Sequence, residues 1–239
     1  MVTSMITINS QDKVTLINFD DGKVNVLNES SLKALIQAFD DSRDAGAVVL
    51  MGGGKCFSAG LDLKTMITLD KPQLNSLLQL FSDLLIKILD FPCPVVAAVN
   101  GHAIAGGAVL TLCCDYAVGV EQELKIGLSE VAVGMPLPTL VVELARNRLS
   151  APRLTEAVLF GRLYSWEDAL QVGYLHQSAP AEKLRETALA VASQLSKLPR
   201  PAYHRTKQAL FGNLPKELGS DAIESFLTGE ARKHMSQFS

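Results

Sequence analysis

The sequence has no long apolar run and little excess of charge of either sign. The longest apolar run ends at Asp115 and is shorter than the roughly 20 residues that a membrane-spanning helix needs. The formal net charge is only -3 over 239 residues, so no nucleic-acid partner is expected. The opening residues, MVTSMITINSQDK, lack a basic stretch followed by an apolar one, which argues against a secretory signal. We therefore expect neither a membrane nor a nucleic acid as partner.

Cysteine is also scarce, and its four occurrences form no motif. Cys56, Cys93 and the adjacent Cys113 and Cys114 make no Cys-x-x-Cys pair, and no His-x-x-x-His pattern accompanies them, so no metal site is expected. The adjacent pair lies in an apolar run, where free buried thiols are the usual outcome. A reducing compartment, by default the cytoplasm, is therefore expected.

The sequence does contain one stretch around which the rest is arranged, residues 100–115 (NGHAIAGGAVLTLCCD). It follows a short apolar run, residues 94–99, that is typical of a buried strand. The stretch turns at Asn100 and Gly101, passes through the glycine pair Gly106 and Gly107, and continues as an apolar segment. A glycine pair that opens a buried helix allows close approach to the backbone and leaves N–H groups free to donate.

Strands and helices alternate through the first half of the chain. Apolar periodicity predicts two amphipathic helices, one starting near Ser30 and one at residues 72–89, and strands at residues 6–8, 14–19, 47–51, 94–99, 116–118 and 124–126. The second half is mainly helical, with helices expected at residues 137–149, 152–160, 165–172, 181–198, 201–211 and 216–234. This order predicts an α/β fold of stacked β/α units that ends in a helical region.

Two glycine-bearing turns are candidates for binding a developing negative charge. Residues 59–61 and 105–107 each place small side chains where a strand gives way to a helix. Close packing is the commoner reason for such glycines. If the two turns converge, however, their N–H groups form an oxyanion hole, in which the loss of one donor costs roughly 3 kcal/mol. A third glycine run, residues 52–54, does not complete a phosphate-binding loop, because Cys56 follows Lys55 where that loop needs Ser or Thr.

At these turns the chain resembles the crotonase superfamily, the enoyl-CoA hydratases and isomerases. The resemblance rests on residues 57–64 (FSAGLDLK), 94–115, 128–134 and 169–173. It implies a crotonase-like (ClpP/crotonase) spiral of β-β-α units over residues 1–190, and a helical C-terminal trimerisation region over residues 191–239. It also implies an acyl-CoA thioester as substrate, with no cofactor beyond the coenzyme A that the substrate carries. A homotrimer or a dimer of trimers is expected.

The resemblance assigns roles to individual residues. The N–H groups of Leu61 and Gly106 correspond to the oxyanion donors, and Glu130 corresponds to a catalytic acid/base. Lys64 corresponds to a partner for phosphate or ribose. The residues expected along the coenzyme A part of the substrate are Ala59, Gly60, Leu61, Asp62, Leu63, Lys64 and Gly106. From their neighbourhood, the acyl pocket is expected to include Met66, Val109, Met135 and Leu137.

Three positions bear on which reaction of the family this chain catalyses. Hydratases of this kind carry two glutamates, and here Val109 takes the place of the first, while Glu130 takes the place of the second. Hydration needs two proton-handling groups, whereas an isomerase needs one. Dienoyl-CoA isomerases and hydroxyacyl-CoA hydrolases carry an aspartate where this chain has Pro138. The chain resembles the Δ3,Δ2-enoyl-CoA isomerases more closely, since they too carry an A-G-L-D-L turn, an A-G-G run followed by C-D-Y, and a proline at this later point, here residues 59–63, 105–116 and 138.

Two other hypotheses stay open beside the isomerase. One is an enoyl-CoA hydratase or acyl-CoA hydrolase that uses a different second catalytic group. The other is a non-catalytic acyl-CoA-binding protein. The sequence supports Glu130 as the base only weakly: if residues 125–133 are extended, Glu130 shares a face with Ile126 and Leu128. A carboxylate on such an apolar face is partly desolvated, which raises its pKa and suits proton transfer.

The remaining polar candidates are expected to be structural. His102 lies beside the second glycine turn, and Asp62 and Asp115 are expected to bond to turn backbone. Trp166 and Tyr164 are expected to pack the C-terminal helices. A solvated helix face is expected for the basic run of Arg200, His204, Arg205 and Lys207.

Overall fold

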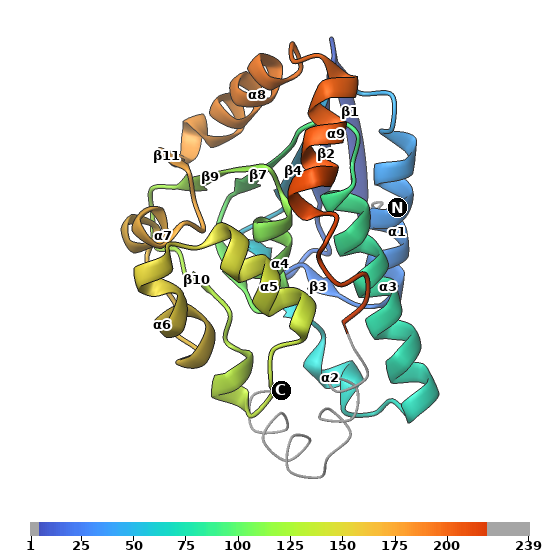
Figure 1. Ribbon diagram of the computed structural model, residues 1–239, viewed down its shortest axis with the longest axis vertical. Helices are drawn as coiled ribbons and strands as arrows, with labels where there is room; N and C mark the ends of the chain where they lie inside the picture. Colours follow the sequence, from blue (N-terminus) through green and yellow to red (C-terminus); the bar gives the residue numbers. More distant parts are fainter. Residues whose placement is uncertain (1–4, 219–239) are drawn as a thin grey trace.

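The computed structural model describes residues 5–218 (Figure 1). Of the helix expected at residues 216–234, all but the first three residues lie outside this range. Within it, no helix is both long and apolar enough to cross a membrane.

A six-stranded sheet forms the main layer of the molecule. Its strands run in the order β1 (Ile6–Gln11), β2 (Val14–Phe19), β4 (Ala47–Gly52), β7 (Val95–Val99), β9 (Tyr116–Val120) and β11 (Gln177–Ala179). β1 and β2 form an antiparallel hairpin, and every other neighbouring pair is parallel. The inner strands are nearly continuous Val, Ala and Leu runs, as expected for parallel strands covered on both faces.

Short strands form two smaller sheets beneath the main one. β3 (Val26–Leu27) pairs with β6 (Gly60–Leu61), and β10 (Ile126–Gly127), β8 (His102–Ile104) and β5 (Cys56–Ser58) form a three-stranded sheet. A long strand of the main sheet is thus followed by short strands and then by a helix, as in β2–β3–α1 and β7–β8–α4. This repetition is the β-β-α unit that the resemblance implied.

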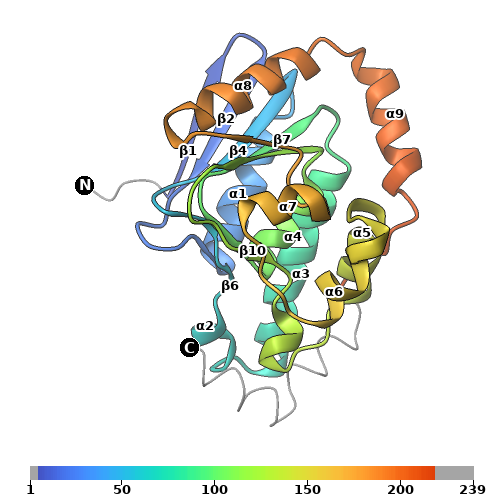
Figure 2. The same cartoon turned by 90° about the vertical axis from the view of Figure 1, so that its left-hand side faces the viewer.

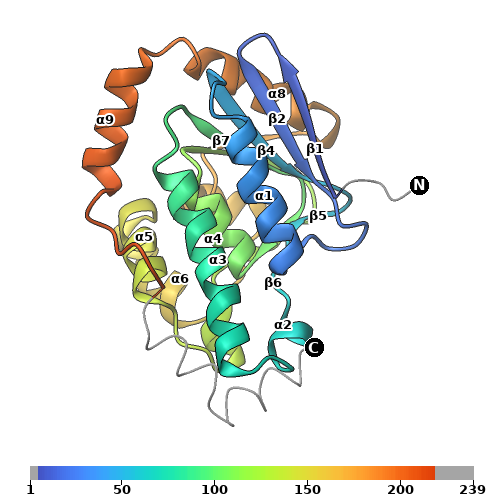
Figure 3. The same cartoon turned by 90° about the vertical axis from the view of Figure 1, so that its right-hand side faces the viewer.

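Helices cover both faces of the main sheet. The larger core lies between the sheet and α1 (Glu29–Asp41), α3 (Lys71–Leu89) and α4 (Gly106–Cys113), and α1 and α3 lie side by side in Figure 3. α8 (Leu184–Leu195) closes the opposite face with a smaller core, as Figure 2 shows. Residue 190, where the core was expected to end, therefore lies inside a helix that packs on the sheet.

The other helices lie beside this layered centre. They are α2 (Leu63–Met66), α5 (Thr139–Arg148), α6 (Leu154–Leu159), α7 (Trp166–Val172) and α9 (Arg200–Phe211), with 3-10 turns η1 (Glu130–Val133), η2 (Ala151–Arg153) and η3 (Ala181–Lys183). The strand at β11 was not expected in the second half, which is therefore not purely helical.

The predicted solvated face of α9 is wrong for Lys207. Its side chain is buried, and its Nζ lies 2.7 Å from Oδ2 of Asp115 and 2.9 Å from the carbonyl oxygen of Ile88. The same Asp115 oxygen accepts a hydrogen bond from the Val95 N–H. Asp115 bonds to backbone, as expected, and in addition joins α9 to the layered centre.

Candidate active site

A cavity of about 470 Å3 lies below the main sheet, where α3, α4 and the segment after β10 come together. Apolar side chains dominate its walls. Among the described lining residues, only Ser129 and Glu130 have polar side chains. The lining residues are Ala59, Leu61, Leu63, Met66, Leu78, Phe81, Ile104, Ala105, Gly106, Val109, Ser129, Glu130, Ala132, Val133, Met135, Pro138, Val141, Gly161, Leu163 and Leu218.

A buried hydrogen-bond network holds the first glycine turn in place. The Asn25 side-chain amide donates to the carbonyl oxygens of Gly53 (3.0 Å) and Cys56 (2.7 Å). The Ser58 hydroxyl donates to the Asn25 carbonyl oxygen at 2.7 Å and accepts from the Gly60 N–H at 3.1 Å. Because buried polar groups with satisfied partners are rigid, this network fixes the turn that ends at the cavity. Sequence reasoning missed Asn25, whose only local signal is an asparagine after an Asp-Gly turn.

The two glycine turns touch each other. A methyl group built on Gly60 would lie 2.7 Å from the backbone nitrogen of Gly106, closer than carbon and nitrogen approach without bonding. Gly60 also has a φ of +83°, a conformation that glycine adopts without strain. The convergence that the sequence left open is therefore present in the fold.

The Leu61 N–H points away from the paired edge of β6. The next N–H along the strand, that of Asp62, donates to the Leu27 carbonyl oxygen of β3 at 3.2 Å. Successive N–H groups of an extended strand point in opposite directions, and the second edge of β6 has no partner strand among the described residues. The Leu61 N–H therefore lies on the open edge, and Leu61 lines the cavity.

The Gly106 N–H is oriented by the start of α4. The Ala105 carbonyl oxygen accepts from the Val109 N–H at 3.0 Å. In a planar trans peptide the C=O and N–H bonds point in opposite directions, so the N–H of Gly106 points out of the helix N-terminus. The first N–H groups of a helix have no intrahelical partner, and the helix dipole adds partial positive charge there. A negatively charged oxygen is favoured at this end of the cavity.

Glu130 supplies the ionisable group of the cavity. The expectation that residues 125–133 are extended is wrong, because β10 ends at Gly127 and Glu130 opens η1. Its burial comes instead from this tight turn, which is closed by a hydrogen bond from the Met135 N–H to the Glu130 carbonyl oxygen (3.0 Å). Within the described chain, Oε2 of Glu130 is buried and has no hydrogen-bond partner.

Burial raises the pKa of Glu130 from 4.5 to about 7, and a hydrogen bond with its own backbone opposes this rise only in part. Desolvation disfavours the ionised form of a carboxyl group. A carboxyl group with a pKa near neutrality is suited both to accept and to return a proton. Glu130 lines the same cavity as Leu61 and Gly106.

The other sequence-predicted residues divide between the cavity and its surroundings. Met66, Val109 and Met135 line the cavity, whereas Leu137 lines a separate groove, so its expected place in the acyl pocket is wrong. Lys64 is exposed on α2. Asp62 caps that helix through the N–H groups of Lys64 and Thr65.

His102 has the role that the sequence predicted, whereas the position of Leu78 and Phe81 at the cavity was not predicted. His102 is structural, as expected, since its Nδ1 accepts from the Lys125 N–H at 3.0 Å. Leu78 and Phe81 of α3 were expected only as part of a packed helix face, yet both line the cavity. Periodicity reports that a face is apolar, and it does not distinguish a face packed on protein from one that faces a ligand.

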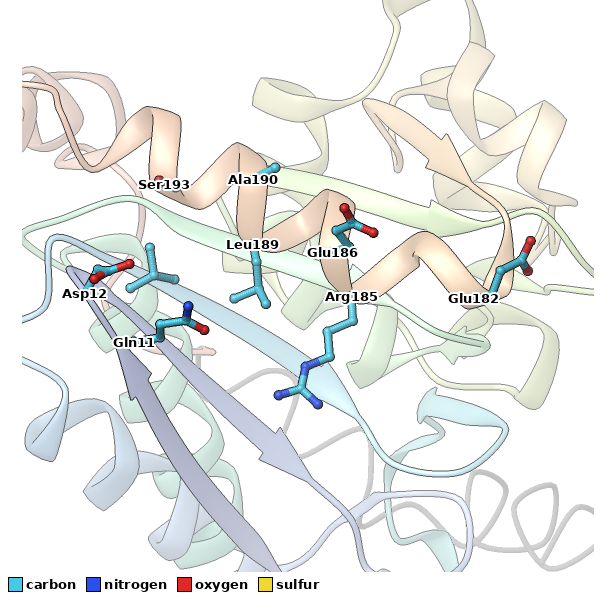
Figure 4. Close-up of a pocket in the computed structure, with 9 residues that line it drawn as sticks. Gln11, Asp12, Glu182, Arg185, Glu186, Leu189, Ala190 and Ser193 are labelled. Carbon is cyan, nitrogen blue, oxygen red and sulfur yellow. The ribbon is translucent and has the colours of Figure 1, made fainter.

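A second hollow of about 520 Å3 lies between the β1–β2 hairpin and α8 (Figure 4). Arg185 and Leu189 point from α8 toward the strands in this view. The hollow is shallow and its charged side chains, such as Glu182 and Glu186, are exposed. None of the residues predicted for catalysis lines it.

Comparisons with known proteins agree with this geometry. The family model described as enoyl-CoA hydratase/isomerase matches residues 9–235. Human mitochondrial enoyl-CoA hydratase domain-containing protein 3 is 31% identical over 215 residues, which cover 87% of this chain and 69% of that protein.

Solved structures give the same result. A Mycobacterium tuberculosis protein, called an enoyl-CoA isomerase in one solved structure and a probable enoyl-CoA hydratase in another, superposes in both with a TM-score of 0.83 at 30% identity. The match covers 98% of this chain and 98% and 94% of those chains. Human mitochondrial delta3-delta2-enoyl-CoA isomerase superposes with a TM-score of 0.94 at 22% identity, over 98% of this chain and 96% of that one; this second likeness bears on the fold alone. The chain belongs to the enoyl-CoA hydratase/isomerase family and has the crotonase fold.

Proposed function

We propose that the protein isomerises an enoyl-CoA, moving a double bond from the 3,4 to the 2,3 position of the acyl chain. The observation that supports this most strongly is the buried Oε2 of Glu130, which has no hydrogen-bond partner among the described residues. It lies in a cavity whose walls are mostly apolar. The thioester oxygen would accept from the N–H groups of Leu61 and Gly106. The coenzyme A part would follow residues 59–64, with the exposed Lys64 available to a phosphate.

Glu130 alone can carry out both proton transfers of this reaction. Its carboxylate takes a proton from C2, and the electrons of the C2–H bond delocalise over C1 to C4 as a dienolate. The two N–H donors stabilise the negative charge on the thioester oxygen. The carboxylic acid returns the proton to C4, which restores the C1 carbonyl and leaves the double bond between C2 and C3.

The composition of the cavity favours isomerisation over hydration. Val109 is buried and lines the cavity at the position where a hydratase would carry its first glutamate. No second carboxylate is found among the described lining residues. Adding water requires one group to activate the water and another to handle the proton at C2, whereas a double-bond shift requires only Glu130.

A substrate panel tests the proposal. Purified protein is incubated with 3-enoyl-CoA, 2-enoyl-CoA and 3-hydroxyacyl-CoA thioesters, and products are separated by chromatography. Conversion of 3-enoyl-CoA to 2-enoyl-CoA is expected to be the fastest reaction. Water addition at a comparable rate would favour the hydratase alternative, thioester cleavage the hydrolase, and calorimetric binding of acyl-CoA without any turnover a non-catalytic protein.

The pH dependence of isomerisation is expected to follow Glu130. The carboxylate must be ionised to accept the proton from C2, and its pKa is about 7. We therefore expect kcat/KM to rise roughly tenfold for each pH unit below 7 and to level off above about pH 8. Initial rates measured from pH 5.5 to 9 check this, and a profile already flat at pH 5.5 would contradict the assignment of Glu130 as base.

Assembly and compartment complete the proposal. A homotrimer or dimer of trimers is expected, and light scattering coupled to size-exclusion chromatography measures it directly. The four cysteines are free and buried, which supports a reducing compartment such as the cytoplasm.

A further inference from the structure

The second glycine turn contains a strained residue that is not glycine. Ala105 has a φ of +50° and a ψ of -120°, a combination that is accessible to glycine and costly for a residue with a Cβ. The equivalent left-handed position of the first turn, φ +83°, is occupied by Gly60. Backbone geometry alone would favour glycine at both positions.

Hydrogen bonds on both sides hold Ala105 in this conformation. Its N–H donates to the Gly127 carbonyl oxygen of β10 at 3.0 Å, and its carbonyl oxygen accepts from the Val109 N–H of α4 at 3.0 Å. These bonds involve only backbone atoms, so a glycine at position 105 would make them equally well. They explain how the strain is tolerated and leave open what the methyl group contributes.

The surroundings of Ala105 point to the cavity. Ala105 is half-buried and lines the cavity, whereas the next residues of α4, Gly106 and Gly107, are buried. Strained residues cluster at active sites, where the strain is part of how the site works. The methyl group belongs to the residue directly before the Gly106 N–H, so it borders the position where the thioester carbonyl would lie.

We propose that Ala105 is a substrate-positioning residue, whose methyl group forms the wall beside the Gly106 N–H and holds the thioester against the two donors. The inference rests on the proposed isomerase function. Without the methyl group the thioester has room to shift, and a misplacement of about 1 Å can cost roughly 100-fold in rate. The strain would thus be retained for catalysis and not for stability.

The variant Ala105→Gly separates this role from a structural one. Removal of the strain is expected to keep the Tm unchanged or raise it by about 2–4 °C, while kcat/KM for 3-enoyl-CoA falls about 10-fold or more. Ala105→Ser keeps the Cβ atom and is expected to retain kcat/KM within about threefold. A group that only supports the fold would instead lower the Tm when replaced.

The chain offers a matched control in Asp12, which has a φ of +54° in the exposed β1–β2 turn. Asp12→Gly likewise replaces a positive-φ residue by glycine, at a position that does not line the cavity, and its kcat/KM is expected to equal that of the wild type. The inference is overturned if Ala105→Gly keeps kcat/KM within twofold, or if it lowers the Tm. A wild-type protein that turns over no 3-enoyl-CoA would instead overturn the proposed function itself.

Discussion

Replacement of Glu130 with glutamine is expected to lower isomerase kcat/KM by roughly 10²–10⁴-fold. Glutamine has nearly the same shape as glutamate but cannot take up a proton from C2. The two backbone donors remain, so binding of acyl-CoA is expected to persist, and calorimetry measures it. The loss should therefore appear in kcat with little change in KM.

The same substitution is expected to stabilise the fold above neutral pH. The pKa of Glu130 is about 7 when folded and near 4.5 for an exposed carboxyl, so between these values the folded protein holds a proton that the unfolded chain releases. Wild-type stability therefore falls as pH rises from 4.5 to about 7. At about 1.4 kcal/mol for each pH unit, the full cost is about 3 kcal/mol.

Denaturant titrations of both proteins at pH 5 and pH 8 measure this linkage. Glu130→Gln is expected to unfold with a smaller pH dependence than the wild type, by about 2–3 kcal/mol over the interval. Glu186→Gln, at an exposed position on α8, is the matched control and should change neither activity nor pH dependence. Full turnover by Glu130→Gln would remove Glu130 from the mechanism, whatever its effect on stability.

Glu130 shows that the physical argument for a residue can fail although the residue still lines the cavity. The residue was identified by its place in a family motif, and it lines the cavity, while its role as acid/base stays a prediction. The physical argument beside it, alternation along an extended segment, failed because residues 130–133 form a 3-10 turn. Neither periodicity nor propensity distinguishes four residues of extended chain from a single tight turn.

The long elements were predictable and the short ones were not. α3 and β2 have the predicted character because periodicity accumulates over their length. β3 and β6 have two residues each, and they exist because parallel pairing joins segments far apart in the chain. The convergence of Gly60 and Gly106 depends on those pairings, so only the folded chain could reveal it.

Lys207 is the clearest case in which composition was misleading. A helix with several basic residues normally presents them to solvent, and that pattern predicted a solvated face. The side chain of Lys207 is only 3% exposed because Asp115 and the end of α3 lie opposite it. A buried charge requires a partner, and the partner is 92 positions away in the chain.

Breaking this buried pair is expected to have the largest effect on stability of the changes considered. Lys207→Met keeps most of the apolar volume but leaves Asp115 without its closest cation, since Arg148 lies 3.9 Å away from the other carboxylate oxygen. The Ile88 carbonyl oxygen also loses its donor. Removing one partner of a buried ion pair costs about 3–5 kcal/mol, and urea unfolding measures this loss.

A matched substitution isolates burial as the cause. Lys33→Met removes an equally close ion pair, with Glu29, in which the two side chains are 60% and 66% exposed, and it is expected to cost no more than about 0.5 kcal/mol. The double variant Lys207→Met with Asp115→Asn should lose less than the sum of the two single variants, because the pair acts as one unit. Equal effects of Lys207→Met and Lys33→Met would show that burial does not make the Lys207–Asp115 pair important for stability. Because Asp115 lies two residues after the end of α4, a large effect of Lys207→Met would mean that the segment leading out of this helix is held from outside the cavity.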